Sequence, residues 1–84
     1  MPKSKNPEYA ALNAAIGKRV AERRRIKGLT QARLAELMGV SVNSVKAWEQ
    51  GRANPYLRFP LLTSVLGCSP DWLYSGKTSS LLYS

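Results

Sequence analysis

The order of apolar and polar residues along the chain predicts α-helices and shows no strand pattern. Over residues 9–27, Leu12, Ile16 and Val20 recur at every fourth position, which places them on one face of a helix. Basic residues followed by Gly28 then form a typical helix stop signal. We therefore predict a first helix over about residues 9–27.

Two short helices are predicted next, and each begins after a hydroxyl side chain. Thr30 and Ser41 can each accept a hydrogen bond from an amide of the turn that follows. Glycines are suited to end both helices, which therefore run over about residues 31–38 and from Ser41 to about Gln50. The side chains expected to face the core are Leu34, Ala35, Leu37, Met38, Val40, Val45 and Trp48.

Two further helices are predicted from the positions of prolines. Pro60 is tolerated only in the first turn of a helix, so a fourth helix begins near Arg58 and ends at Gly67. The Ser-Pro-Asp segment 69–71 combines a cap, a proline at the first helical position and an acid that complements the helix dipole. It predicts a fifth helix that stops at Gly76. The expected buried side chains are Leu61, Leu62, Val65, Leu66, Trp72 and Leu73.

The length of 84 residues fits one domain. A domain of this size buries roughly 60% of the surface that its unfolded chain exposes, so its stability margin is small. Residues 1–8 contain two prolines and two lysines, and we expect them to form a flexible basic arm. We expect one all-α, five-helix domain over residues 9–76 and a C-terminal tail over residues 77–84.

Net charge changes this picture, because thirteen basic residues face only five acidic ones and give +8 at pH 7. A small domain with this charge is suited to bind a polyanion, either nucleic acid or an anionic membrane surface. Six of the cations lie within residues 18–27. They form either a nucleic-acid-facing surface or an ordinary solvated helix face. These six are Lys18, Arg19, Arg23, Arg24, Arg25 and Lys27.

The chain has little equipment for catalysis. It has no histidine, one cysteine and five scattered acids, so neither a carboxylate pair nor a metal site can be proposed. We therefore expect no enzyme activity, no cofactor or metal and no small-molecule ligand. Cys68 is expected to be a small buried hydrophobe rather than a redox centre. No run of 18 apolar residues and no signal-peptide segment is present, which favours a cytoplasmic location without membrane binding.

The segment 30–51 carries the strongest functional signal. Its sequence, TQARLAELMGVSVNSVKAWEQG, combines two short helices with a tight glycine-containing turn. Two helices joined by such a turn form a helix-turn-helix, whose second helix enters the major groove of DNA. Together with the basic charge, this motif predicts sequence-specific DNA binding.

Three sequence motifs occur in a fixed order along the chain. They are TQ-x-x-LA-x-x-MGVS from residue 30, V-x-x-WEQG from residue 45 and CSPDWLYSG from residue 68. Together they resemble the lambda-repressor/Cro (XRE-type) family of DNA-binding domains, over about residues 14–76. The resemblance implies a compact five-helix, lambda-repressor-like domain with its helix-turn-helix at the second and third helices. It also implies a transcriptional regulator.

The resemblance implies that the third helix reads the bases of DNA. Its base-contacting residues are expected to be Val42, Asn43, Ser44 and Ala47. Asn43 can pair with adenine through two hydrogen bonds, and Val42 can pack against a thymine methyl group. Many family members carry glutamine at the position of Val42, so their glutamine–adenine contact is not expected in this chain.

The resemblance also implies a set of contacts to DNA phosphates. Helix N-termini attract phosphate, and by the family pattern Gln31 binds a phosphate and steadies the first side chains of the third helix. Lys46 can reach a guanine or a phosphate, of which we favour phosphate. Arg24 and Glu49 match a semi-buried ion pair between the first and third helices. The expected phosphate-contacting residues are Thr30, Gln31, Ser41, Lys46, Arg52, Asn54 and Arg24.

The predicted function is that of a small phage-type Cro or repressor protein. One recognition helix reads only a few base pairs, so we expect a homodimer on a palindromic operator in double-stranded DNA. The apolar tail residues Leu81, Leu82 and Tyr83 are a candidate dimer interface; packing on their own domain, or disorder, is the alternative. An antitoxin or adaptor that binds a protein partner and regulates its own promoter is the alternative function. A cationic peptide on a membrane surface is a third hypothesis, which the core-facing stripe of the first helix disfavours.

Overall fold

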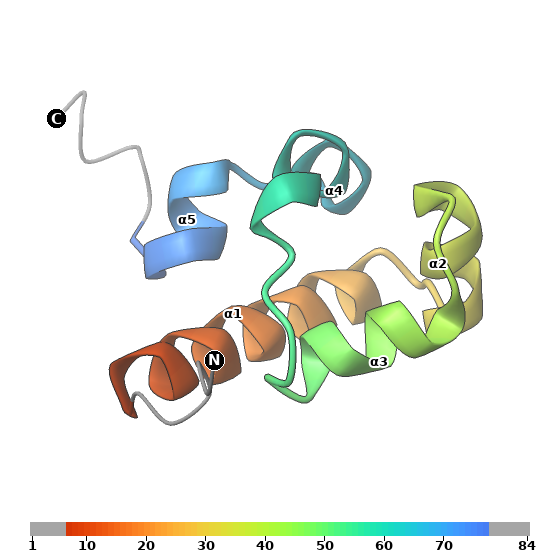
Figure 1. Cartoon of the computed structure of the whole chain (residues 1–84). Coiled ribbons are helices and arrows are strands. Elements are labelled where there is room, and N and C mark those ends of the chain that lie inside the picture. The colour runs from red at the N-terminus through yellow and green to blue at the C-terminus, as the bar shows by residue number, and fades with distance from the viewer. Residues whose placement is uncertain (1–6, 78–84) are drawn as a thin grey trace, which may run out of the picture.

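The computed structural model describes residues 7–77 and shows within them five α-helices and one short 3-10 helix (Figure 1). In chain order they are α1 (Pro7–Ile26), α2 (Gln31–Met38), α3 (Val42–Glu49), η2 (Tyr56–Arg58), α4 (Phe59–Leu66) and α5 (Pro70–Ser75). No strand occurs in this part of the chain, so the predicted all-α, five-helix class is confirmed. None of these helices has the length and hydrophobicity needed to cross a membrane.

Helix α1 begins two residues earlier than predicted. Pro7 and Glu8, which composition assigned to the flexible arm, form its first turn. Proline is well placed there because the first amides of a helix have no intrahelical partner, and the carboxylate of Glu8 complements the helix dipole. The rest of the predicted arm (residues 1–6) and all of the predicted tail except Lys77 lie outside the described residues.

Side-chain caps fix where the shorter helices start. Thr30 Oγ1 accepts a hydrogen bond from the amide of Arg33 at 2.9 Å, and Ser41 Oγ accepts one from the amide of Ser44 at 3.2 Å. Ser69 caps α5 in the same way. Each cap of this kind contributes about 1 kcal/mol relative to alanine. The starts of α2, α3 and α5 therefore agree with the sequence prediction.

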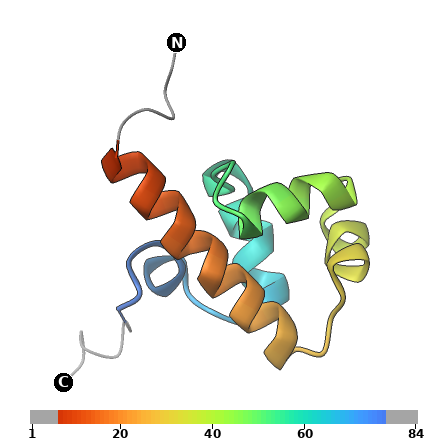
Figure 2. The ribbon, with the colours of Figure 1, turned by 90° about the horizontal axis from the view of Figure 1, so that it is seen from below.

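Helix α1 is the element on which the others pack. Figure 2 shows it running diagonally across the molecule, with α3 on one side and α5 on the other. Ile16 and Val20 of α1 are fully buried, as the four-residue spacing predicted, and Leu12 packs partly buried against the core. The other buried core side chains are Leu34, Ala35, Met38, Val45, Trp48, Phe59, Leu62, Leu66 and Leu73.

Two core predictions are wrong, and one core residue was not predicted. Leu37 and Leu61, predicted to face the core, are 39% and 48% exposed, whereas Phe59 was not predicted and is buried. In α4 the buried stripe recurs every third or fourth residue from Phe59 to Leu66, and Leu61 falls outside it. Because most residues of α4 are apolar, periodicity could not select this stripe. Three other residues that were predicted to lie in the core are partly buried and pack against it: Val40, Val65 and Trp72.

Close contact between α1 and α3 depends on Gly17. A Cβ atom at this position would lie 2.8 Å from the carbonyl oxygen of Glu49 and would also meet that of Trp48. Both oxygens belong to the backbone of α3, so they cannot move aside as the end of a flexible side chain would. Glycine therefore allows the two helices to approach and sets the position of α3.

Two arginines of α1 attach the C-terminal half of the domain. Arg23 donates from Nε and Nη2 to the carbonyl oxygen of Leu66 at 3.1 and 3.0 Å. Arg19 donates from Nε and Nη2 to the carbonyl oxygens of Leu73 and Tyr74, both at 2.9 Å. These oxygens lie at the ends of α4 and α5, where a helix carries unpaired carbonyls and negative partial charge. Two of the cations in the basic run therefore stabilise the fold.

Candidate nucleic-acid interface

The predicted helix-turn-helix consists of α2, the turn over residues 39–41, and α3. Gly39 has a φ of 70°, in the left-handed region that favours glycine. The amide of the next residue, Val40, donates to the carbonyl oxygen of Ala35 at 3.0 Å. These features pair the last carbonyls of α2 and fix the direction in which α3 leaves the turn.

Helix α3 presents one side to the core and the other to solvent. Val45 and Trp48 are buried, whereas Asn43, Lys46 and Gln50 are exposed. The exposed residues follow one another at helical spacings of three and four, so they form a single stripe along α3 and its C-cap. We call Asn43, Lys46 and Gln50 the outer stripe. Amide and ammonium groups of this kind can contact both base edges and phosphates.

The four residues predicted to contact bases lie within the first six positions of α3. Asn43 is exposed, and Val42, Ser44 and Ala47 are half-buried. The hydroxyl oxygen of Ser44 lies 3.2 Å from that of Ser41, so this side chain turns toward its own helix cap. Asn43 is therefore the most accessible of the four for hydrogen bonding to a base.

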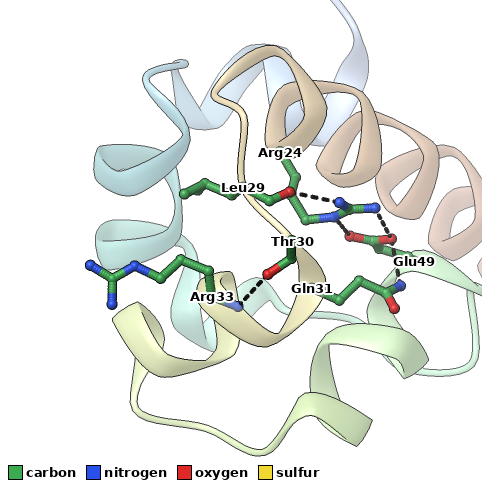
Figure 3. A network of polar contacts seen from close by, with 6 residues as sticks. All are labelled: Arg24, Leu29, Thr30, Gln31, Arg33 and Glu49. Atoms are coloured by element: carbon green, nitrogen blue, oxygen red, sulfur yellow. Dashed lines mark hydrogen bonds and ion pairs between the residues drawn. The ribbon is translucent and has the colours of Figure 1, made fainter.

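A largely buried ion pair holds the end of α3 against α1 (Figure 3). Arg24 Nε donates to Glu49 Oε2 at 2.6 Å, and Arg24 Nη2 donates to Glu49 Oε1 at 3.2 Å. The two side chains are 11% and 7% exposed. The third nitrogen, Nη1, donates to the carbonyl oxygen of Leu29 at 2.8 Å. Every nitrogen of this guanidinium group therefore has a partner inside the protein, and the two charged residues are those that the resemblance paired.

Gln31 joins this network from the start of α2. Its Nε2 donates to Glu49 Oε1 at 2.9 Å. The resemblance implied that Gln31 steadies the first side chains of α3, but in the structure its amide bonds to the last residue of that helix. The carboxylate of Glu49 thus links α3 to both α1 and α2.

The loop after α3 holds two residues predicted to contact phosphate. Asn54 Oδ1 accepts from the amide of Tyr56 at 2.8 Å, and its Nδ2 donates to Asn13 Oδ1 at 2.9 Å. Arg52 is exposed, and its Nε donates to Gln50 Oε1 at 2.8 Å. Asn54 therefore fixes the loop to α1, whereas Arg52 lies beside the outer stripe and faces solvent.

The structure divides the basic run over residues 18–27 into two groups. Arg24 and the two arginines that hold α4 and α5 donate within the protein, whereas the other three cations are exposed. Lys18, Glu22 and Arg25 line an open groove of about 510 Å³ that reaches Gln50. Composition could not single out Lys18 and Arg25 as neighbours of the outer stripe, because their position depends on how α1 packs against α3.

Cys68 packs half-buried against the core. Burial raises the pKa of its thiol, and the positive charge of Arg23 opposes this shift with a smaller effect. A raised pKa keeps the thiol in its neutral, weakly nucleophilic form. Across residues 7–77, no group of three potential metal ligands is present.

These features define a helix-turn-helix domain, a class of DNA-binding domain in which a tight turn joins two short helices and the second presents a polar face. The family model described as helix-turn-helix matches residues 20–73 of the chain. The chain belongs to the lambda-repressor/Cro-like (XRE-type) helix-turn-helix family, as its three motifs indicated.

Similar curated proteins include regulators from two bacteria and a phage. The HTH-type transcriptional regulator DicA of Escherichia coli (strain K12) is 38% identical over 65 residues, which cover 76% of this chain and 48% of DicA. Repressor protein C2 of Salmonella phage P22 is 35% identical over 65 residues, covering 76% of this chain and 30% of the repressor. The SPbeta prophage-derived uncharacterized HTH-type transcriptional regulator YonR of Bacillus subtilis (strain 168) is 34% identical over 62 residues. These residues cover 73% of this chain and 57% of YonR.

The matched region thus spans between 30% and 57% of the length of these relatives. No solved structure matches the chain.

Proposed function

We propose that this chain is a sequence-specific repressor of transcription that binds a palindromic operator as a homodimer, with α3 in the major groove. The observation that carries the proposal is the outer stripe of α3, on a helix whose opposite side is fixed by the burial of Trp48 and by the Arg24–Glu49 pair. A recognition surface that is ordered before binding loses less conformational entropy on binding.

Within this proposal, Asn43 supplies the main base contact. Its exposed amide can donate to and accept from one adenine, a paired contact that discriminates against the wrong base by about 1–3 kcal/mol. Val42 and Ala47 are half-buried and apolar, so they suit van der Waals contact with a thymine methyl group. Ser44, turned toward the cap of α3, makes at most a secondary base contact.

Phosphate contacts would position the domain on the duplex without reading its sequence. The first amides of α2 and α3 have no intrahelical partners, and the helix dipoles make these sites positive. In the proposal, Thr30, Gln31 and Ser41 bind phosphates at these helix starts. Lys46 and Arg52 bind phosphates beside the outer stripe.

Arg24 and Asn54, which the resemblance implied as phosphate contacts, do not bind phosphate in this proposal. Their side chains already donate to Glu49 and Asn13, so they shape the interface from within. Exposed Lys18 and Arg25 lie on the same side as Gln50 and supply positive charge instead. The assignment of the cations follows from their exposure, since the side chain of Arg24 is 11% exposed, whereas Lys18 and Arg25 are exposed.

A second copy of the chain would supply the discrimination that one α3 lacks. Dimeric helix-turn-helix proteins bind two half-sites one helical turn apart, at about 34–36 Å. The P22 relative is named as a repressor protein, which supports repression rather than activation. The proposal includes a cytoplasmic location, which the bacterial and phage origin of the relatives supports.

Selection from random DNA tests this function. The full chain is mixed with duplexes whose random region can hold two half-sites one helical turn apart, and the bound DNA is recovered and sequenced over several rounds. We expect an inverted repeat to be enriched over the input pool, with an A·T pair at the same position in each half. Binding that is sensitive to salt but enriches no sequence would show a non-specific DNA-binding protein and contradict the proposal.

A further inference from the structure

The basic run over residues 18–27 contains a single acid, Glu22. Lys18, Glu22 and Arg25 follow one another at spacings of four and three, which places them side by side on one face of α1. All three side chains are exposed, and in the part of the chain that the structure describes Glu22 forms no ion pair with either cation. A carboxylate therefore lies between two cations that face solvent.

These three residues line the open groove of about 510 Å³ between α1, the start of α2 and the end of α3, which we call the α1 groove. Gln31, the first residue of α2, lines it from the opposite side together with Gln50, the last member of the outer stripe. The α1 groove is therefore continuous with the face that binds DNA in the function proposed above.

The charges of the α1 groove are not all available to a ligand. Glu49 also lines it, but its carboxylate is 7% exposed and is paired with Arg24. The charges that an incoming anion meets are those of Lys18 and Arg25, which attract it, and that of Glu22, which repels it. The sum of these three charges is positive, so the α1 groove is suited to a phosphate, and Glu22 reduces the attraction.

We propose that a phosphate of the DNA backbone lies in the α1 groove and that Glu22 weakens binding to DNA of every sequence. The inference rests on the repressor proposed above and identifies a residue that sets its affinity. Lys18 and Arg25 neutralise the phosphate, whereas the carboxylate between them opposes it and competes for the same two cations. Contacts to the backbone carry no sequence information directly, so the choice of sequence is left to α3.

The overall charge of the chain gives this acid a function. With thirteen basic and five acidic residues, the chain attracts any duplex, and phosphate contacts supply essentially all of the affinity for non-specific DNA. An acid at such a contact raises the protein concentration at which DNA is occupied. Base contacts, such as that of Asn43, then contribute a larger share of the free energy with which an operator is bound.

Replacement of Glu22 by glutamine tests this inference, because it removes the charge and keeps the size of an exposed side chain. Asp71→Asn is the matched control. It removes the same charge from an exposed residue of α5, which Figure 1 shows at the end of the molecule away from α2. Fluorescence anisotropy of the full chain with labelled random duplex and with the selected operator measures the affinities at several salt concentrations. Circular dichroism spectra that match the wild type show that the variants are folded.

We expect Glu22→Gln to bind both duplexes about three- to tenfold more tightly than the wild type at low salt. Asp71→Asn should stay within about twofold, because its charge is far from the duplex and is screened. The gain of Glu22→Gln should shrink as salt rises, and the slope of log affinity against log salt should steepen by up to about one unit. When Lys18→Gln and Arg25→Gln are added, most of the gain should disappear, since the phosphate is no longer held in the α1 groove.

Three results would overturn the inference. The first is a gain for Glu22→Gln that is no larger than that for Asp71→Asn. The second is a gain that persists in full when Lys18 and Arg25 are replaced by glutamine, because the carboxylate would then act away from the α1 groove. The third is a gain confined to the operator, which would make Glu22 a determinant of sequence.

The two duplexes separate this inference from the proposed function. Equal affinities of Glu22→Gln and Asp71→Asn for random duplex, in a chain that selects an operator, would refute the role of Glu22 and leave the repressor function in place. A gain at Glu22 on random duplex, in a chain that selects no operator, would support the α1 groove and contradict the repressor function.

Discussion

The carboxylate of Glu49 offers the sharpest test of how the DNA-binding face is held in place. It is 7% exposed and accepts three hydrogen bonds, two from Arg24 and one from Gln31. In a Glu49→Ala variant, the guanidinium of Arg24 loses its counter-charge and keeps only its bond to the carbonyl oxygen of Leu29. The variant therefore leaves a largely buried positive charge without compensation.

The expected loss of stability is large for a domain of this size. Removing one partner of a buried ion pair costs about 3–5 kcal/mol, and the 11% exposure of Arg24 places the loss near the lower value. At about 0.05–0.15 kcal/mol per residue, an 84-residue chain has a free energy of unfolding of about 4–13 kcal/mol. A loss of about 3 kcal/mol lowers the Tm of such a domain by about 12–24 °C.

Thermal and urea unfolding, followed by far-ultraviolet circular dichroism, measure this loss. Glu36→Ala is the matched control, because Glu36 forms an ion pair with Arg33 at 2.8 Å while the two side chains stay 70% and 53% exposed; its expected effect is within about 1 kcal/mol. The double variant Arg24→Met/Glu49→Leu removes both buried charges and should lose less stability than Glu49→Ala alone. The reasoning is refuted if Glu49→Ala is no more destabilising than Glu36→Ala, or if Arg24→Met/Glu49→Leu loses as much stability as Glu49→Ala.

Three further predictions concern DNA binding and packing. Asn43→Ala should weaken binding to the selected operator by about 1–3 kcal/mol and leave binding to random duplex unchanged; equal losses in filter-binding assays of the two duplexes would remove Asn43 from base reading. Arg52→Ala should weaken binding to every duplex and reduce the slope of log affinity against log salt by about one unit, and an unchanged slope in anisotropy titrations would place Arg52 away from the phosphates. Gly17→Ala should lower the free energy of unfolding by about 1–3 kcal/mol, because its Cβ meets backbone oxygens of α3. Urea unfolding checks this, and a midpoint equal to that of the wild type would show that α1 and α3 can separate without cost.

Helix boundaries could be predicted from the sequence because each depends on residues close together in the chain. Thr30 and Ser41 each bond to an amide three residues later, and Gly39 occupies the left-handed turn directly after α2. Interactions of this range leave a pattern of residue types that a single sequence displays. The same reasoning missed the start of α1 at Pro7, since the composition of the first eight residues resembled an arm.

Contacts between distant segments leave no such pattern. Arg19 and Arg23 bond to carbonyl oxygens 54 and 43 positions further along the chain, and every residue type supplies a carbonyl oxygen. These arginines therefore could not be distinguished from cations that face solvent. The exposure of Leu61 could not be predicted for a related reason: most residues of α4 are apolar, so the sequence does not show which side of the helix is buried. The pairing of Arg24 with Glu49 was implied only by the family resemblance, since neither charge nor spacing singles these residues out.

The arginines of α1 also determine which exchanges of one basic residue for another the chain tolerates. Arg19, Arg23 and Arg24 each donate from at least two nitrogens of one planar group, and lysine, with the same charge on a single nitrogen, cannot reproduce such a contact. Lys18 and Lys27 are exposed, so lysine and arginine are both tolerated at these two positions. Among related chains, positions that keep arginine while neighbouring basic positions alternate freely would therefore mark the charges that hold the domain together, with no structure needed to find them.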